Sequence, residues 1–149
     1  MKPVLFELGG VPVSSYGVSK ALAILAAIWI LARELRRVDL SPDLAYPLVL
    51  AGAAGGFLGA KLYYLAEHAD SLTLHSFGGS GFTWYGGLIG GALAVLAVIA
   101  HKRLPVAAIA GVAGIPLAVA YAIGRIGCFL AGDGTYGVAS DLPWAMSFP

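Results

Sequence analysis

The chain has 149 residues, of which 59% are hydrophobic and 11% charged, and its formal net charge is +1. Soluble domains carry about 45–50% apolar and about 25% charged residues, so this composition indicates an integral membrane protein. The small net charge argues against nucleic acid as a partner, since nucleic-acid-binding domains present a basic face. A single cysteine excludes an internal disulfide, and the three histidines lie at no spacing typical of metal ligands. We therefore expect neither a metal nor a cofactor.

Four apolar stretches are long enough to cross a bilayer, which takes about 20 helical residues. They run from about Ser14 to Ala32, from Leu44 to Ala66, from Trp84 to Ala100 and from Pro105 to Ile123. These stretches predict an all-α, polytopic membrane helix bundle with about four transmembrane helices. We expect residues 1–149 to form a single transmembrane domain.

The lysines and arginines of the short loops predict how this bundle is oriented. Two loops are basic, and the loop between them, residues 67–83, contains neither lysine nor arginine. The basic loop residues are Arg33, Arg36, Arg37, Lys102 and Arg103. Because cytoplasmic loops carry the excess of positive charge, we expect both basic loops in the cytoplasm and the N-terminus outside.

Three further cations, Lys20, Lys61 and Arg125, lie within or at the edge of apolar stretches, in the half expected to face outward. A lysine or arginine at the bilayer centre costs about 2.5–3.5 kcal/mol on insertion scales, so such residues suggest a function. Each could instead extend its charge to the membrane interface. Taken together, the three would also form the positive cluster that gripping a lipid phosphate requires. Both interpretations remain open from the residues alone.

The second and third stretches contain pairs of glycines four residues apart. These pairs are Gly52/Gly56, Gly55/Gly59, Gly86/Gly90 and Gly87/Gly91. This spacing places the glycines of each pair on one helix face, where they allow two helices to pack closely in lipid. We interpret them mainly as packing residues.

Residues 124–137 follow the fourth stretch and place Arg125 and Asp133 among five glycines. Glycine lets the backbone turn and approach a ligand closely, and an arginine beside an apolar segment suggests an anionic ligand. The alternative is a helix end with a structural Arg–Asp pair and a turn. The residues by themselves favour neither interpretation.

Five segments match, in order, the pattern of one known family. They are Ser15 to Gly17, Gly59 to Tyr64, Trp84 to Gly90, Gly124 to Asp133 and Leu142 to Pro149. The fourth aligns without a gap to the signature Gly-Arg-Ile/Leu-Gly-Asn-Phe-Ile-Asn-Gly-Glu. On these matches the chain resembles the N-terminal part of the prolipoprotein diacylglyceryl transferase family.

The resemblance implies transfer of a diacylglyceryl group from phosphatidylglycerol to the lipobox cysteine of bacterial prolipoproteins, at the inner membrane. It implies no cofactor, and its partners would be phosphatidylglycerol, the prolipoprotein signal-peptide region and a C-terminal half or partner subunit. The implied catalytic residues are Arg125 for the leaving phosphate, Tyr85 as a phenolic hydrogen-bond donor, and Asp133 to orient Arg125 or bind the glycerol head. The implied phosphatidylglycerol-binding residues are Arg125, Lys61, Tyr16, Gly127 and Gly132.

Four positions depart from the family's pattern. Lys61 replaces an arginine, Tyr85 a histidine, Cys128 an asparagine and Asp133 a glutamate. A phenol keeps its proton at neutral pH, so Tyr85 is a weaker base than histidine. Two alternatives follow: a non-catalytic lipid-binding or assembly subunit related to the family, or a small anion transporter. The transporter is the less favoured, although glycine-rich helices with internal cations also suit anion passage.

Overall fold

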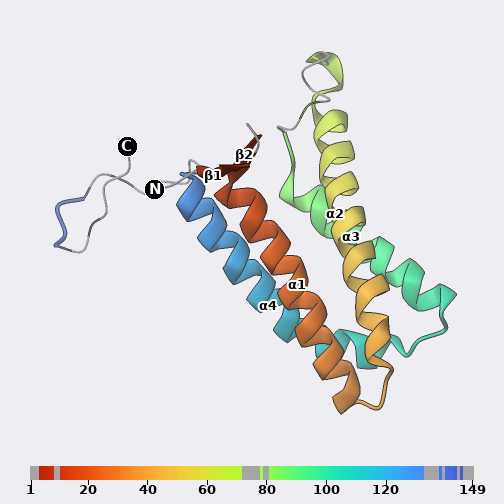
Figure 1. The fold of residues 1–149 in the computed structure, drawn as a ribbon. Helices are drawn as coiled ribbons and strands as arrows, with labels where there is room; N and C mark the ends of the chain where they lie inside the picture. The colour runs from red at the N-terminus through yellow and green to blue at the C-terminus, as the bar shows by residue number, and fades with distance from the viewer. Residues whose placement is uncertain are drawn as a thin grey trace. The chain divides into compact units, whose positions relative to one another are not determined.

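The structure, a computed structural model, describes residues 4–8, 11–71, 78, 81–132, 138, 140–143 and 145. In chain order its elements are β1 (Val4–Leu8), β2 (Val11–Ser14), α1 (Ser15–Arg37), the 3₁₀ turn η1 (Pro42–Leu44), α2 (Ala45–Glu67), the 3₁₀ turn η2 (Ala69–Ser71), α3 (Trp84–His101) and α4 (Val106–Ala131) (Figure 1). Among the described residues, four helices are long and apolar enough to cross a membrane. The prediction of a polytopic helix bundle is therefore confirmed.

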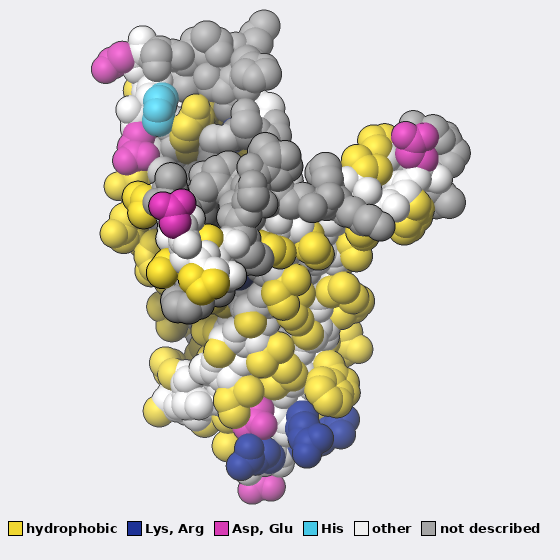
Figure 2. All heavy atoms as spheres, turned by 90° about the vertical axis from the view of Figure 1, so that its left-hand side faces the viewer, with side chains coloured by type: hydrophobic (Ala, Val, Ile, Leu, Met, Phe, Trp, Pro, Cys, Tyr) yellow, Lys and Arg dark blue, Asp and Glu magenta, His cyan; other side chains and the backbone are white. Residues whose placement is uncertain are grey.

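Large apolar side chains stay exposed on the helices. Examples are Leu25, Trp29, Leu62, Leu93 and Leu117. Hydrophobic side chains cover much of the helix surface visible in Figure 2. Water-soluble proteins rarely expose large continuous apolar patches, whereas a lipid-facing surface requires them. The surface thus supports the membrane assignment made from composition.

The predicted end of the fourth stretch at Ile123 is wrong, because α4 continues to Ala131. Glycine weakens a helix by only about 1 kcal/mol relative to alanine, which apolar surroundings readily override. Within a bilayer the backbone has no water to bond to, so continuing the helix satisfies its polar groups. Gly124 and Gly127 are therefore helical residues and not part of a turn.

A short β-hairpin, which no feature of the sequence predicted, precedes α1. Strands β1 and β2 pair antiparallel, with Val4 opposite Ser14 and Leu8 opposite Val11. The hairpin leads directly into α1, where the Gly17 amide donates to Ser14 Oγ at 3.0 Å. Ser14 thereby satisfies one of the amides that the first turn of a helix leaves without a partner.

The chain forms two compact units, one of Met1–Ala26 with Leu117–Pro149 and the other of Ala27–Pro116. The second unit has a core drawn from all four helices. It consists of Leu31, Leu35, Ala45, Leu48, Ile99, Ile109 and Val112. Whether the whole chain acts as a single domain stays a prediction.

Helices α1 and α3 end in the same way. Asp39 and Arg103 have positive φ angles of 56° and 52°. The next amides, those of Leu40 and Leu104, each donate to a carbonyl five residues earlier at 2.9 Å. This is the Schellman arrangement, in which a left-handed residue lets the chain turn back over the last helical turn. Both leucines pack against the core of the second unit.

Helices α2 and α3 pack backbone to backbone through their glycines (Figure 1). A Cβ at Gly55 would lie 2.6 Å from the carbonyl oxygen of Gly90, and a Cβ at Gly59 would lie 2.8 Å from the Gly90 Cα. A Cβ at Gly86 would overlap Tyr63 and the backbone of Gly59. These contacts confirm the packing role predicted from the four-residue spacing.

Candidate functional site

Arg125 lies on α4, six residues before the helix ends at Ala131. Its side chain is exposed, and it makes no hydrogen bond or ion pair with any residue that the structure describes. Gly127, two residues further along, faces α1, because a Cβ there would lie 2.5 Å from the Cβ of Ser19. Two helical residues correspond to a rotation of about 200°, so Arg125 projects from the face turned away from this contact.

The end of α4 is set by Gly132. This residue has a φ of +72°, and its amide donates to the carbonyl of Phe129 at 3.4 Å. Glycine is the usual residue just after a helix because the left-handed conformation is free of strain for it. The role of Gly132 in phosphatidylglycerol binding stays a prediction. Asp133 lies outside the described residues, so its roles also stay predictions.

Tyr16 lies in the first turn of α1, in the same unit as Arg125. The Lys20 ammonium is 4.0 Å from the centroid of its ring, within the range of a cation–π interaction. Tyr16 also approaches α4, since a Cβ at Gly127 would lie 3.8 Å from its Cδ2 atom. The start of α1 and the end of α4 thus bring together Tyr16 and Gly127, two of the predicted binding residues.

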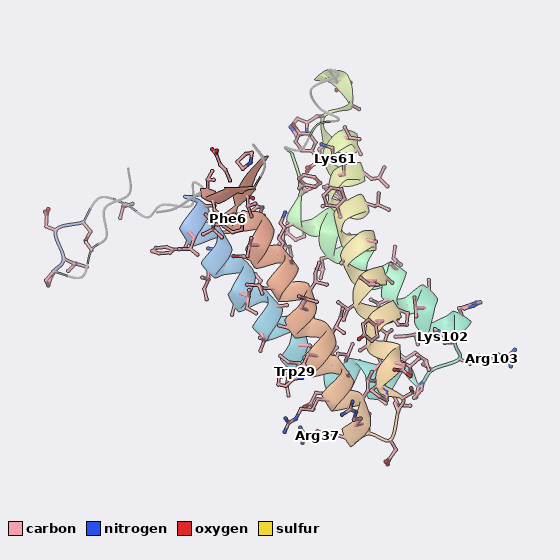
Figure 3. The ribbon with its side chains drawn as sticks, in the orientation of Figure 1. Phe6, Trp29, Arg37, Lys61, Lys102 and Arg103 are labelled. Atoms are coloured by element: carbon pink, nitrogen blue, oxygen red, sulfur yellow. The ribbon has the colours of Figure 1, made fainter. Side chains whose placement is uncertain are left out.

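Lys61 lies near the end of α2 (Figure 3) and is held by the segment that leads into α3. Its ammonium donates to the carbonyl oxygen of Gly78 at 2.8 Å. The same nitrogen is 5.0 Å from the ring centroid of Phe82 and 5.4 Å from that of Tyr64. A phosphate bound by Lys61 would have to share the ammonium with these groups. The role of Lys61 as a second cation for phosphate stays a prediction.

A further pair of hydrogen bonds holds the start of α3 against α2. The amide and the hydroxyl of Thr83 both donate to the carbonyl of Ala60, at 3.2 and 3.0 Å. Lys61 and its neighbour Ala60 thus bind Gly78 and Thr83 to the same turn of α2. Spacing could have indicated Tyr64, which lies one helical turn from Lys61, but no sequence signal pointed to Phe82 or Gly78.

Tyr85 lies in the first turn of α3 and is exposed, with 66% of its surface accessible. Its ring meets that of Trp84 edge to face, with centroids 5.3 Å apart. Its hydroxyl makes no hydrogen bond within the described part of the chain. A phenol in this position can donate a hydrogen bond to a ligand without first breaking another.

The predicted site residues belong to both compact units. Arg125, Tyr16, Gly127 and Gly132 belong to the first unit. Lys61 and Tyr85 belong to the second. The first unit contains an exposed guanidinium, that of Arg125, on an apolar helix. A guanidinium is suited to bidentate binding of phosphate or carboxylate. The second unit offers an exposed phenol and an ammonium held by aromatic rings.

The family model described as prolipoprotein diacylglyceryl transferase matches residues 3–149. Curated relatives carry the name phosphatidylglycerol–prolipoprotein diacylglyceryl transferase. One from Clostridium tetani is 37% identical, over 99% of this chain and 61% of the relative. One from Enterococcus faecalis is 33% identical, over 85% of this chain and 48% of the relative, and one from Geobacter sulfurreducens is 30% identical, over 99% and 59%. The chain thus spans about half to three fifths of the length of these relatives.

Proposed function

Because this chain belongs to the prolipoprotein diacylglyceryl transferase family, we propose that it serves as a phosphatidylglycerol–prolipoprotein diacylglyceryl transferase in bacterial lipoprotein maturation. The observation that carries the proposal is the family match over residues 3–149, which includes the segment around Arg125. The substrates would be phosphatidylglycerol and the lipobox cysteine of a prolipoprotein signal-peptide region. The four membrane-length helices suit a reaction whose lipid donor is available only in a bilayer.

The reaction joins the cysteine sulfur to the terminal glyceryl carbon of the diacylglyceryl group. The bond between that carbon and the phosphate oxygen breaks, and glycerol phosphate leaves with the bonding electrons. A thiol is a good nucleophile only as its thiolate, so its proton must pass to a base or to the departing phosphate. The site must therefore assist loss of the thiol proton and stabilise negative charge on the phosphate.

Arg125 is the proposed phosphate ligand. A guanidinium presents paired N–H donors that match two phosphate oxygens, and the exposed position of Arg125 on α4 leaves it accessible to a lipid. Lys61 would supply a second positive charge, while Tyr16 and Tyr85 would donate hydrogen bonds. Asp133 would orient Arg125 or bind the glycerol head.

Gly127 and Gly132 would let the backbone lie close to the lipid headgroup, since neither carries a side chain. Gly127 is buried against Ser19 on the face of α4 turned away from Arg125, so a headgroup that contacts both residues would have to reach around the helix. Gly132 ends α4 and so directs the chain that follows Arg125.

We propose that the protein lies in the bacterial inner membrane with its basic loops in the cytoplasm. This orientation follows from the arginines and lysines after α1 and α3. The relatives are longer than this chain, and we propose that a C-terminal half or partner subunit supplies the remaining part of the site.

A chimera tests the assignment without requiring the chain to act alone. This chain would replace the aligned segment of the Clostridium tetani relative, and lipidation of a prolipoprotein peptide in phosphatidylglycerol bilayers would be followed by mass spectrometry. We expect Arg125→Ala to lower the rate by about 10²–10³-fold, the effect of removing one transition-state donor. Arg37→Ala is the matched control, since Arg37 is an exposed arginine already paired with Glu34.

Unchanged lipidation by the Arg125→Ala chimera would refute the role of Arg125. A chimera that retains phosphatidylglycerol but never lipidates the peptide would favour the non-catalytic lipid-binding subunit. Tyr85 stands where the family has a histidine, and this observation favours the second candidate, the non-catalytic subunit. Anion flux across reconstituted vesicles would instead favour the transporter.

A further inference from the structure

An open hollow of about 300 Å³ lies on one face of α1, close to its C-terminal end. Its lining residues are Trp29, Ala32, Arg33 and Arg36. Ala32 and Arg33 lie three and four residues after Trp29, and Arg36 lies one turn further, so the four share one helix face. We call this the Trp29 hollow. Its volume is at the lower end of the range for small-molecule pockets, about 300–1,000 Å³.

The two arginines of the Trp29 hollow, Arg33 and Arg36, are not engaged in ion pairs with the described residues. Glu34 is the acidic residue nearest in sequence, and both of its carboxylate oxygens accept from Arg37 Nη1, at 3.1 and 3.0 Å. Two guanidiniums therefore border an open hollow and lack an anion.

The position and exposure of Trp29 indicate that the hollow lies near the membrane surface. Its side chain is 67% exposed, and it lies in the C-terminal half of α1, about two turns before Arg37 (Figure 3). Tryptophan is enriched at the level of lipid headgroups because its ring is apolar and its N–H group polar. In Figure 2, lysine and arginine side chains gather at one end of the visible face, next to hydrophobic side chains.

We propose that the Trp29 hollow binds the headgroup of an anionic phospholipid from the leaflet at this end of α1. Arg33 and Arg36 hold the phosphodiester through charge-assisted hydrogen bonds, and the Trp29 ring packs on the glycerol and the first acyl carbons. An anionic headgroup is favoured over a zwitterionic one because choline brings its own positive charge beside the two guanidiniums. This lipid is bound and not consumed, so the proposal does not depend on the transferase reaction.

The tryptophan itself provides the measurement. In a Trp84→Phe, Trp144→Phe background, Trp29 is the only tryptophan, and lipids with brominated acyl chains quench its fluorescence on contact. The protein would be reconstituted in bilayers that mix brominated phosphatidylglycerol with ordinary phosphatidylcholine, and in bilayers with the bromine on the other lipid. The two quenching curves yield the binding preference at Trp29 for phosphatidylglycerol.

We expect Arg33→Gln and Arg36→Gln each to lower this preference about fivefold, the effect of one basic residue near an anionic membrane surface. The double variant should show a preference close to one. Two controls should retain it: Arg37→Gln, which removes a paired arginine, and Lys102→Gln with Arg103→Gln, which removes two charges from the loop after α3. No preference in the parent protein, or an equal loss in the Lys102/Arg103 control, would overturn the proposal.

Discussion

Glycine plays opposite parts in two regions of this protein. Between α2 and α3, glycines meet backbone to backbone, and added side-chain atoms would overlap the neighbouring helix. On α4, Gly111, Gly114 and Gly124 have no described atom within 4 Å of the place where a Cβ would be. Glycine therefore lets α2 and α3 pack closely together, whereas on α4 it lies on a surface that no described residue covers.

The difference shows that a glycine pattern predicts a contact only when a partner helix is present. Helices associate in lipid through close van der Waals contact, so the α2–α3 glycines stabilise their pair directly. The open glycines of α4 contribute no such contact within the described chain. Gly127 differs from them, since it packs on Ser19. Three substitutions of glycine by alanine test this ranking.

Gly90→Ala should have the largest effect. Its Cβ would overlap the Gly55 carbonyl and lie 2.8 Å from the Gly59 Cα, and both are backbone atoms that cannot rotate away. We expect the free energy of unfolding to fall by about 3 kcal/mol, at the upper end for overpacking. Unfolding in mixed micelles with increasing dodecyl sulfate measures it. A loss below that of Gly127→Ala would contradict the ranking.

Gly127→Ala should have an intermediate effect of about 1–2 kcal/mol. The neighbour is the Ser19 side chain, with its Cβ at 2.5 Å and its Oγ at 2.8 Å, and small shifts of α1 can relieve part of the overlap. Ser19→Gly removes the colliding atoms but weakens α1 by itself, so the single Ser19→Gly variant is the reference, and adding Gly127→Ala to it should cost much less than in the parent chain in the same unfolding assay. An equal cost in both backgrounds would show that another contact is responsible.

Gly114→Ala should have the smallest effect and the opposite sign. Nothing described occupies the space around it, so the methyl group meets no obstacle. Alanine is a better helix former than glycine by about 0.8–1.0 kcal/mol, and we expect a gain of no more than this. A clear loss of stability in the chimera with the Clostridium tetani relative, but not in this chain, would reveal a helix that covers this face in the longer protein.

Much of the architecture could be read from local features of the chain. Composition indicated a membrane protein, and the lengths of the apolar stretches located all four helices. The length and the apolar character that a membrane helix needs are both properties of consecutive residues. The spacing of the α2 and α3 glycines predicted their facing contact. The predicted end of the fourth stretch at Ile123 is wrong because the glycines around Arg125, which locally disfavour a helix, lie within α4.

The candidate site was less predictable, because its contacts join residues far apart in sequence. The family pattern singled out Lys61, but no local rule indicated that the Gly78 carbonyl and the Phe82 ring would hold its ammonium. Nor could spacing tell that Gly127 faces α1 while Arg125 faces away from it. The sequence by itself determined which segments are helices in a membrane, since helix hydrogen bonds and lipid burial are properties of each segment alone. Only the tertiary structure decided which side of each helix is occupied and which is open, because that depends on neighbours brought together by folding.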